Sequence, residues 1–112
     1  MKIFISEAAG VTVLALKGKI TIGSGDVALR DAIDDAVGNG QKQLLIDLGG
    51  VSKMDSSGLG ELVAAHNTVT EQGGAIKLAN IPSKLYNIMG VAQIISVFDV
   101  FDDVDEGLTS FE

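Results

Sequence analysis

One apolar segment constrains the fold of this chain more than any other. Residues 43–48 contain Leu44, Leu45, Ile46 and Leu48, with Asp47 as the one polar residue among them. A near-continuous apolar run of this length is typical of a strand that is buried on both faces. The chain has 112 residues, which is enough for one hydrophobic core with little left for a second unit. We therefore expect a single domain over residues 1–112.

Elsewhere the apolar period alternates between two and 3.6 residues, which predicts further strands and helices. Strands are expected over residues 2–7, 11–17, 43–48, 75–80 and 97–101. A loop over 18–25 leads to a helix of about 13 residues, with Ser24 as its N-cap and an end at residues 38–40. Its solvent-exposed side is expected to hold Asp26, Arg30, Asp31, Asp34 and Asp35. Residues 49–55 then connect the buried strand to a helix over 56–71, and shorter helices are expected over 82–89, stopped by Gly90, and over 103–111.

This order of elements defines the fold class. Strands that alternate with helices late in the chain imply parallel neighbours joined by right-handed crossovers. The two strands before residue 18 are close enough to form an antiparallel hairpin. The prediction is an α/β domain with a mixed sheet of four to five strands and helices mainly on one face.

Composition excludes several functions. The formal net charge of −7, from 15 acidic and 8 basic residues, argues against nucleic acid and against anionic lipid headgroups. The chain has no Cys, so a disulfide framework and a thiolate metal site are both excluded. No apolar run approaches the roughly 20 residues that a membrane span needs, and residues 1–7 lack the layout of a signal peptide. We expect a cytoplasmic protein without a membrane or nucleic-acid partner and without a cofactor.

The stretch from Met54 to Gly60 carries the candidate chemistry. It places Ser56 and Ser57 at the start of a helix, directly after a strand, where backbone N–H groups are unpaired and the helix dipole favours negative charge. A phosphoryl group on Ser56 would therefore be tolerated there, and it would add roughly −1.5 to −2 charges beside Asp55. Gly58 and Gly60 lack side chains, which would let another backbone approach closely.

Residue chemistry alone leaves two interpretations of this turn open. Asp-Ser-Ser-Gly is good N-cap chemistry and would need no further role, or Ser56 is a phosphorylation site. A catalytic serine is not favoured, because a nucleophile needs a base within hydrogen-bond reach. The only histidine, His66, lies ten residues along the same helix, roughly 15 Å away. We expect His66 to be packed and hydrogen-bonded, and we expect no catalytic or metal-ligating residues.

Two other stretches resemble binding motifs only superficially. The glycine-containing loop over residues 18–25 lacks the Gly-Lys-Ser/Thr ending of a phosphate-binding loop. The acidic residues between Asp99 and Glu106 lack the glycine that a calcium loop requires at its sixth position. A loop that leads into a helix and a solvated helix start are the preferred interpretations.

The segment Met54-Asp55-Ser56-Ser57-Gly58-Leu59-Gly60 resembles the signature of the STAS domain of bacterial anti-sigma factor antagonists. The resemblance continues through Gly18-Lys19-Ile20, Leu45-Ile46-Asp47-Leu48, Gly73-Gly74 and Val97-Phe98, and so covers essentially the whole chain. It implies a mixed sheet of four or five strands with helices packed largely on one face.

The resemblance also implies a regulatory circuit. The unphosphorylated domain would bind an anti-sigma factor that is itself a serine kinase, which frees the sigma factor. That kinase would phosphorylate Ser56 and dissociate, and a PPM-type serine phosphatase would reset the switch. The partner-binding residues would be Asp55, Ser57, Gly58, Leu59 and Gly60, together with the neighbouring loop residues Ile20, Thr21 and Ile22.

Thr21 departs from this pattern, because many family members carry Asp there. If that acid contacts the kinase, this chain would bind its partner more weakly or use a different one. Two alternatives remain at the level of sequence: a STAS-like structural subunit of a larger signalling or lipid-transport assembly, and a small-molecule or nucleotide binder that uses the turn as an anion site.

Overall fold

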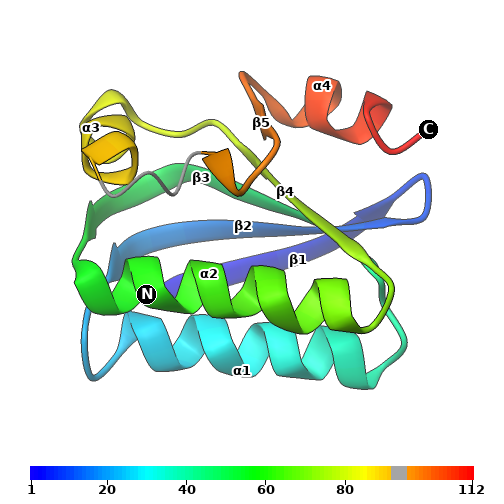
Figure 1. Cartoon of the computed structure of the whole chain (residues 1–112), viewed down its shortest axis with the longest axis horizontal. Coiled ribbons are helices and arrows are strands. Elements are labelled where there is room, and N and C mark those ends of the chain that lie inside the picture. The colour runs from blue at the N-terminus through cyan, green and yellow to red at the C-terminus, as the bar shows by residue number, and fades with distance from the viewer. Residues whose placement is uncertain (92–95) are drawn as a thin grey trace.

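The protein forms one five-stranded sheet with four helices in a computed structural model, which describes residues 1–91 and 96–112 (Figure 1). The strands are β1 (Lys2–Ala8), β2 (Val11–Ile20), β3 (Gln43–Met54), β4 (Ala75–Ala79) and β5 (Val100–Phe101). The helices are α1 (Gly25–Gly38), α2 (Ser56–Glu71), α3 (Ser83–Val91) and α4 (Val104–Thr109). The strands lie in the order β1-β2-β3-β4-β5; β1 is antiparallel to β2, and the other pairs are parallel. The predicted mixed α/β sheet is confirmed.

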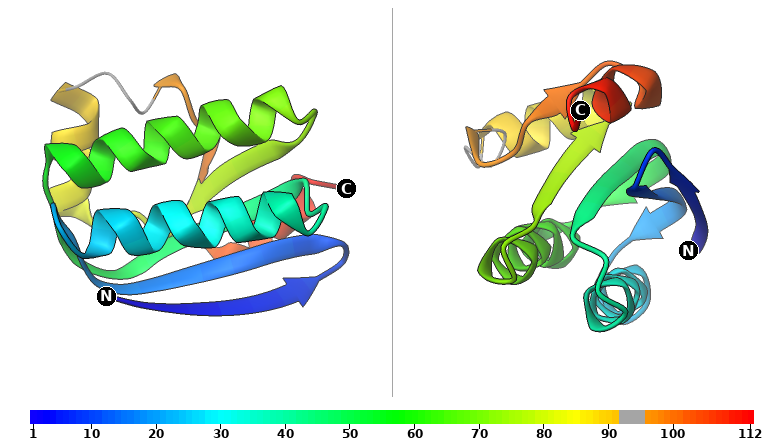
Figure 2. Two further views of the ribbon diagram at one scale, coloured as in Figure 1. Left: turned by 90° about the horizontal axis from the view of Figure 1, so that it is seen from below. Right: turned by 90° about the vertical axis from the view of Figure 1, so that its right-hand side faces the viewer.

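The two long helices cover one face of this sheet. Figures 1 and 2 show α1 and α2 side by side along the same face, with α4 on the other. Between the long helices and the sheet lies the main core, which includes Leu14, Leu16 and Ile46 from the strands and Leu29 and Leu62 from the helices. The alternation along β2 and β3 explains this arrangement, because successive side chains of a strand point to opposite faces.

A smaller core lies under α4 on the opposite face. It contains Val11, Val13, Leu45 and Ala79, against which Val104, Leu108 and Phe111 pack. Lys77 of β4 ties the residues after α4 to the sheet. Its Nζ lies 4.5 Å from the centre of the Phe111 ring and donates a hydrogen bond of 3.1 Å to the Ser110 carbonyl oxygen. Coverage on both faces accounts for the near-continuous apolar run of β3.

The strand β3 is longer than the sequence predicts. Residues 49–54 belong to the strand, and Asp55 alone separates β3 from α2. The prediction of a connecting loop over 49–55 is wrong because β2 and β3 continue their parallel pairing to Ile20 and Met54 through two register shifts. A Cβ at Gly50 would lie too close to the Leu16 carbonyl oxygen of β2. Gly50 therefore belongs to an irregular part of β3 and does not end the strand.

Further local differences concern α1, α3 and β5. Ser24 occupies the N-cap position of α1, but its side chain makes no capping hydrogen bond. Asp26 is 7% exposed rather than solvated, and its Oδ1 accepts a hydrogen bond from the Val27 N–H. The helix α3 runs on to Val91, past the expected stop at Gly90. The strand β5 keeps only Val100 and Phe101 of the predicted 97–101, because Phe98 instead packs into the main core.

Candidate functional site at the start of helix α2

The Asp55 carboxylate joins the start of α2 to the loop between β2 and α1. Asp55 is the N-cap residue of α2, and its Oδ1 accepts a hydrogen bond of 3.0 Å from the Gly58 N–H. Its Oδ2 accepts a second hydrogen bond of 3.0 Å from the Ile22 N–H. The predicted cap is therefore present, and the same side chain also fixes a loop that is distant in sequence.

Two glycines allow the two helix starts to close around the end of β2. A Cβ at Gly25 would overlap the Lys19 carbonyl oxygen, and one at Gly58 would overlap the Ile20 carbonyl oxygen. The backbone that approaches Gly58 thus belongs to this chain. The expected close approach of another backbone is therefore confirmed at Gly58, whereas a Cβ at Gly60 would meet no heavy atom within 4 Å, so that position stays open.

The predicted site residues fall into a supporting layer and an exposed surface. Ile20, Gly58 and Leu59 are buried, so they shape the turn from below and are not available for direct contact with a partner. Asp55, Ser57 and Thr21 are half-buried. Ser56 and Gly60 are exposed, and Ile22 is 74% exposed. The structure therefore brings the loop over residues 20–22 against the turn that carries Ser56.

Hydrogen bonds to Asp55 change its acidity. The N–H groups of Gly58 and then of Ile22 make the largest contributions, and they lower the pKa of Asp55 from its ordinary value of 3.8. Partial removal from water acts in the opposite direction and is the smaller effect. The carboxylate is consequently charged at neutral pH and remains so in moderately acidic solution.

This lowered pKa predicts a pH-dependent contribution of Asp55 to folding. Because the folded pKa lies below the unfolded one, the ionised carboxylate stabilises the fold fully above about pH 4, and this stabilisation is lost as the pH falls through the folded pKa. Asp55→Asn should therefore be less stable than the wild type at neutral pH, and the difference should shrink below pH 4. Urea unfolding of both proteins across this range checks the result. A difference that stays constant into strong acid would contradict it.

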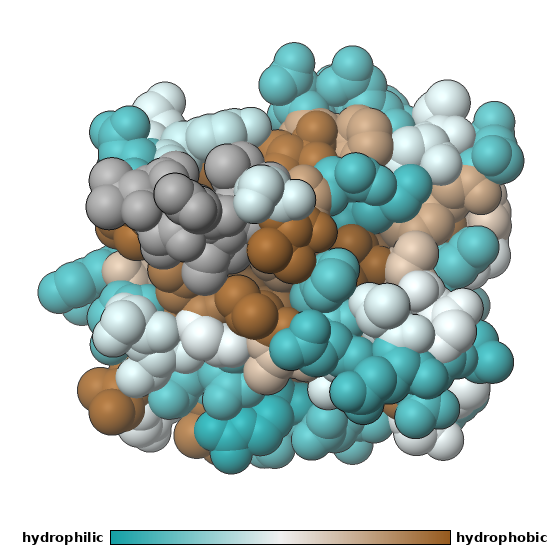
Figure 3. Space-filling model, in the orientation of Figure 1, coloured by the Kyte–Doolittle hydropathy of each residue, from teal (hydrophilic) through white to brown (hydrophobic). Residues whose placement is uncertain are grey.

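The helix α3 borders the same end of the sheet, which the sequence did not indicate. The Lys84 Nζ donates a hydrogen bond to the Ser52 carbonyl oxygen and so holds α3 against the end of β3. Figure 1 shows α3 next to the ends of β2 and β3, where α2 begins. Tyr86 and Ile88 of this helix are exposed. Figure 3 shows apolar surface in the middle of the face seen in Figure 1, above the mostly hydrophilic surface of α1 and α2.

His66 lies away from the turn and packs against an aromatic ring. The centre of its ring lies 5.3 Å from the centre of the Phe98 ring, and the two rings meet edge to face. The expected packing is therefore present, but the expected hydrogen bond is absent at Nδ1, which is buried without a partner among the described residues. The part of the chain that the structure describes also contains no group of three or more His, Cys, Asp or Glu placed to hold a metal ion.

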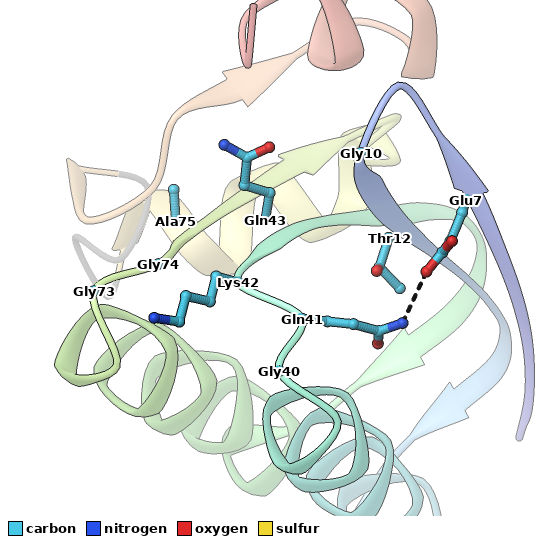
Figure 4. A pocket seen from close by; sticks show the side chains of 10 residues that line it. All are labelled: Glu7, Gly10, Thr12, Gly40, Gln41, Lys42, Gln43, Gly73, Gly74 and Ala75. Carbon is cyan, nitrogen blue, oxygen red and sulfur yellow. Dashed lines mark hydrogen bonds between the residues drawn. The ribbon is translucent and has the colours of Figure 1, made fainter.

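A separate hollow lies at the other end of β3, where the strand begins (Figure 4). It has a volume of about 550 Å³ and is lined by Glu7, Gly10, Thr12, Gly40, Gln41, Lys42, Gln43, Gly73, Gly74 and Ala75. The Gln41 side chain donates a hydrogen bond of 3.0 Å to Glu7 across its wall. Because β3 separates this hollow from Asp55, the hollow is not part of the site around Ser56.

In residues 1–91 and 96–112, no helix has the length and apolar character needed to cross a membrane.

The fold and this turn define a small mixed α/β domain whose exposed polar site is the start of a helix. The chain belongs to the STAS domain family, whose model matches residues 3–107. The anti-sigma F factor antagonist of Paenibacillus polymyxa is 21% identical over 113 aligned positions, which span 100% of this chain and 96% of that protein. The anti-sigma-B factor antagonist of Bacillus subtilis is 37% identical over 57 positions, 51% of this chain and 52% of that protein.

A solved structure supports the same fold. The Bacillus cell fate determinant SpoIIAA, in its phosphorylated form, superposes with a TM-score of 0.77 at 16% identity, and the match covers 99% of this chain and 100% of that chain. At this identity the likeness concerns the fold. The expected family and its mixed sheet are thereby confirmed.

Proposed function

We propose that this chain is an anti-sigma factor antagonist that is switched by phosphorylation of Ser56. In its unphosphorylated form it binds an anti-sigma factor that is a serine kinase, and this binding releases the sigma factor. Phosphorylation of Ser56 ends the interaction, and a PPM-type serine phosphatase restores it. The chain thus acts as a regulatory binding module and itself catalyses no reaction.

The exposure of Ser56 at the start of α2 is the observation that carries this proposal. A kinase needs an accessible hydroxyl, and Ser56 is exposed whereas Ser57 is half-buried. The helix start also tolerates the negative charge of a phosphoryl group, because its N–H groups and dipole favour anions. Two relatives are named anti-sigma factor antagonists, and SpoIIAA has a phosphorylated form, which agrees with the proposal.

The binding surface in this proposal surrounds Ser56. Ile22 contributes an exposed apolar side chain from the β2–α1 loop, and Gly60 leaves room on the first turns of α2. Tyr86 and Ile88 extend the apolar surface along α3. Thr21 is half-buried and uncharged, so this chain offers no carboxylate to a kinase at that position.

Incubation with a cognate anti-sigma factor kinase and ATP tests the proposal. We expect the chain to gain the mass of one phosphoryl group, located on Ser56 by fragmentation mass spectrometry. The wild type and Ser57→Ala should both be labelled, whereas Ser56→Ala should not, because only the exposed hydroxyl is the acceptor. A PPM-type phosphatase should remove the label.

Two results would count against this function. Labelling of Ser56→Ala at the wild-type rate would place the acceptor elsewhere. A chain that remains in one large complex from native lysate, whether or not ATP is added, would favour a structural subunit of an assembly.

A further inference from the structure

The strand β1 is an exposed edge of the sheet with apolar side chains at its centre. The strand order places β1 outermost, so within residues 1–91 and 96–112 one side of its backbone has N–H and C=O groups without a neighbouring strand. Phe4, which pairs with Ala15 of β2, is 57% exposed, and Ile5, which pairs with Leu14, is 60% exposed. As neighbours in a strand, Phe4 and Ile5 point to opposite faces of the sheet. Edge strands usually carry charges or proline, and in β1 the charged residues Lys2 and Glu7 lie only near the two ends.

A groove runs between this edge and α1. The views in Figure 2 show β1 at the outer edge of the sheet with α1 beside it on one face. The groove has a volume of about 390 Å³, and its apolar lining comes from Ile5 and Leu14 on the strands and from Ala28, Ala32 and Ala36 on α1. Small alanine side chains on α1 leave this space open beside the edge strand.

The rim of the groove is acidic. Asp31 and Asp35 of α1 line it and are exposed. In the described part of the chain the single salt bridge joins Arg30 to Glu61, so neither of these two carboxylates takes part in a salt bridge there. The chain as a whole carries a formal net charge of −7. A ligand for this groove should therefore bring positive charge next to apolar side chains.

We propose that the groove between β1 and α1 binds an extended basic and apolar segment of a partner protein, which adds a strand to β1. Backbone hydrogen bonds to the free edge would hold such a segment. Its apolar side chains would cover Phe4 on the face away from α1, and its lysine or arginine side chains would lie over Ile5 on the other face and pair with Asp31 and Asp35. A second copy of this chain is disfavoured as the occupant, because it would bring the same carboxylates to the same rim.

This surface is separate from the site around Ser56. None of the residues that line the groove belongs to the turn from Asp55 to Gly60 or to the loop over residues 20–22. A partner on β1 could thus stay bound while the proposed switch at Ser56 changes state. Binding in the groove should accordingly be the same for the wild type and for Ser56→Asp.

A synthetic peptide tests the proposal. The probe is an acetylated seven-residue peptide that alternates lysine with valine, and the control peptide alternates glutamate with valine. In NMR titrations of the full chain, the lysine peptide should shift the amide signals of β1 and slow the exchange of its edge N–H groups with solvent. The glutamate peptide should do neither.

Variants of the chain locate the binding. Ile5→Lys places a charge in the groove at an exposed position, so it should keep the fold and abolish peptide binding. Asp31→Asn with Asp35→Asn should weaken binding by about three- to tenfold, which is the size expected for losing two exposed ion pairs. Asp102→Asn with Asp105→Asn makes the same change in net charge on exposed residues away from the groove and should have little effect.

The outcomes separate cleanly. Shifts in β1 that Ile5→Lys removes would support the proposal. Absence of binding at millimolar peptide, equal binding of the two peptides, shifts confined to other elements, or equal losses in the two double variants would each overturn it. None of these results depends on phosphorylation of Ser56.

Discussion

Ser56→Asp should weaken binding to the proposed anti-sigma factor kinase by about 100-fold or more. Ser56 is exposed at the start of α2, so the new carboxylate would enter the interface beside the charged Asp55. Placing an additional charge in a desolvated interface costs several kcal/mol, and about 2.7 kcal/mol already corresponds to 100-fold in affinity. Titration calorimetry or surface-based kinetics with the purified kinase measures this change.

Two variants make that result specific. Ser56→Ala should bind the kinase as the wild type does, since it removes the acceptor without adding charge. Ser6→Asp adds the same carboxylate at an exposed position on β1, away from the turn, and it should leave binding within a few-fold of the wild type. Unchanged binding of Ser56→Asp would refute a switch that works by charge at this position.

Gly58→Ala should destabilise the fold by about 2–4 kcal/mol, whereas Gly60→Ala should stabilise it by about 0.5–1 kcal/mol. Both residues lie in the first turns of α2, so the two substitutions add the same methyl group to the same helix. At Gly58 the methyl group would overlap the Ile20 carbonyl oxygen and lie 2.8 Å from the Ile20 Cγ2. At Gly60 it would meet no heavy atom within 4 Å, and alanine favours the helix over glycine.

Urea denaturation of the two variants and the wild type measures these free energies of unfolding. A carbonyl oxygen cannot rotate away as a side chain can, so relief at Gly58 requires movement of α2 against β2. That movement would also disturb the hydrogen bond from Ile22 to Asp55, and Gly58→Ala should therefore bind the kinase poorly even where it remains folded. Equal stabilities of the two alanine variants would show that α2 and β2 are not in close contact.

The sequence allowed the elements with strong periodicity to be predicted. The hairpin of β1 and β2 and the long helix α2 follow directly from apolar spacing and from the glycines that flank them. The family resemblance placed residues 20–22 near the turn, and the hydrogen bond from Ile22 to Asp55 agrees with that placement. The part that these residues play in partner binding stays a prediction.

Several features that the sequence did not place correctly depend on contacts between distant segments. Gly49 and Gly50 look like a loop, but the partner strand β2 continues alongside them and keeps them in β3. The role of Gly58 is set by Ile20, and the role of the alanines on α1 is set by the open edge at β1. Local pattern carries no information about which backbone or edge lies opposite, so these features required the structure.

The contact between Ile22 and Asp55 uses only the backbone N–H of Ile22. The side chain at this position is therefore free to vary in size, polarity and charge, with proline as the one residue that cannot donate this bond. Thr21 likewise takes part in the loop through its backbone: its carbonyl oxygen accepts hydrogen bonds from the N–H groups of Ser24 and Asp26. A gene duplicate of this protein could thus exchange the outward side chains of its loop and acquire a new partner while the geometry around Ser56 is inherited intact.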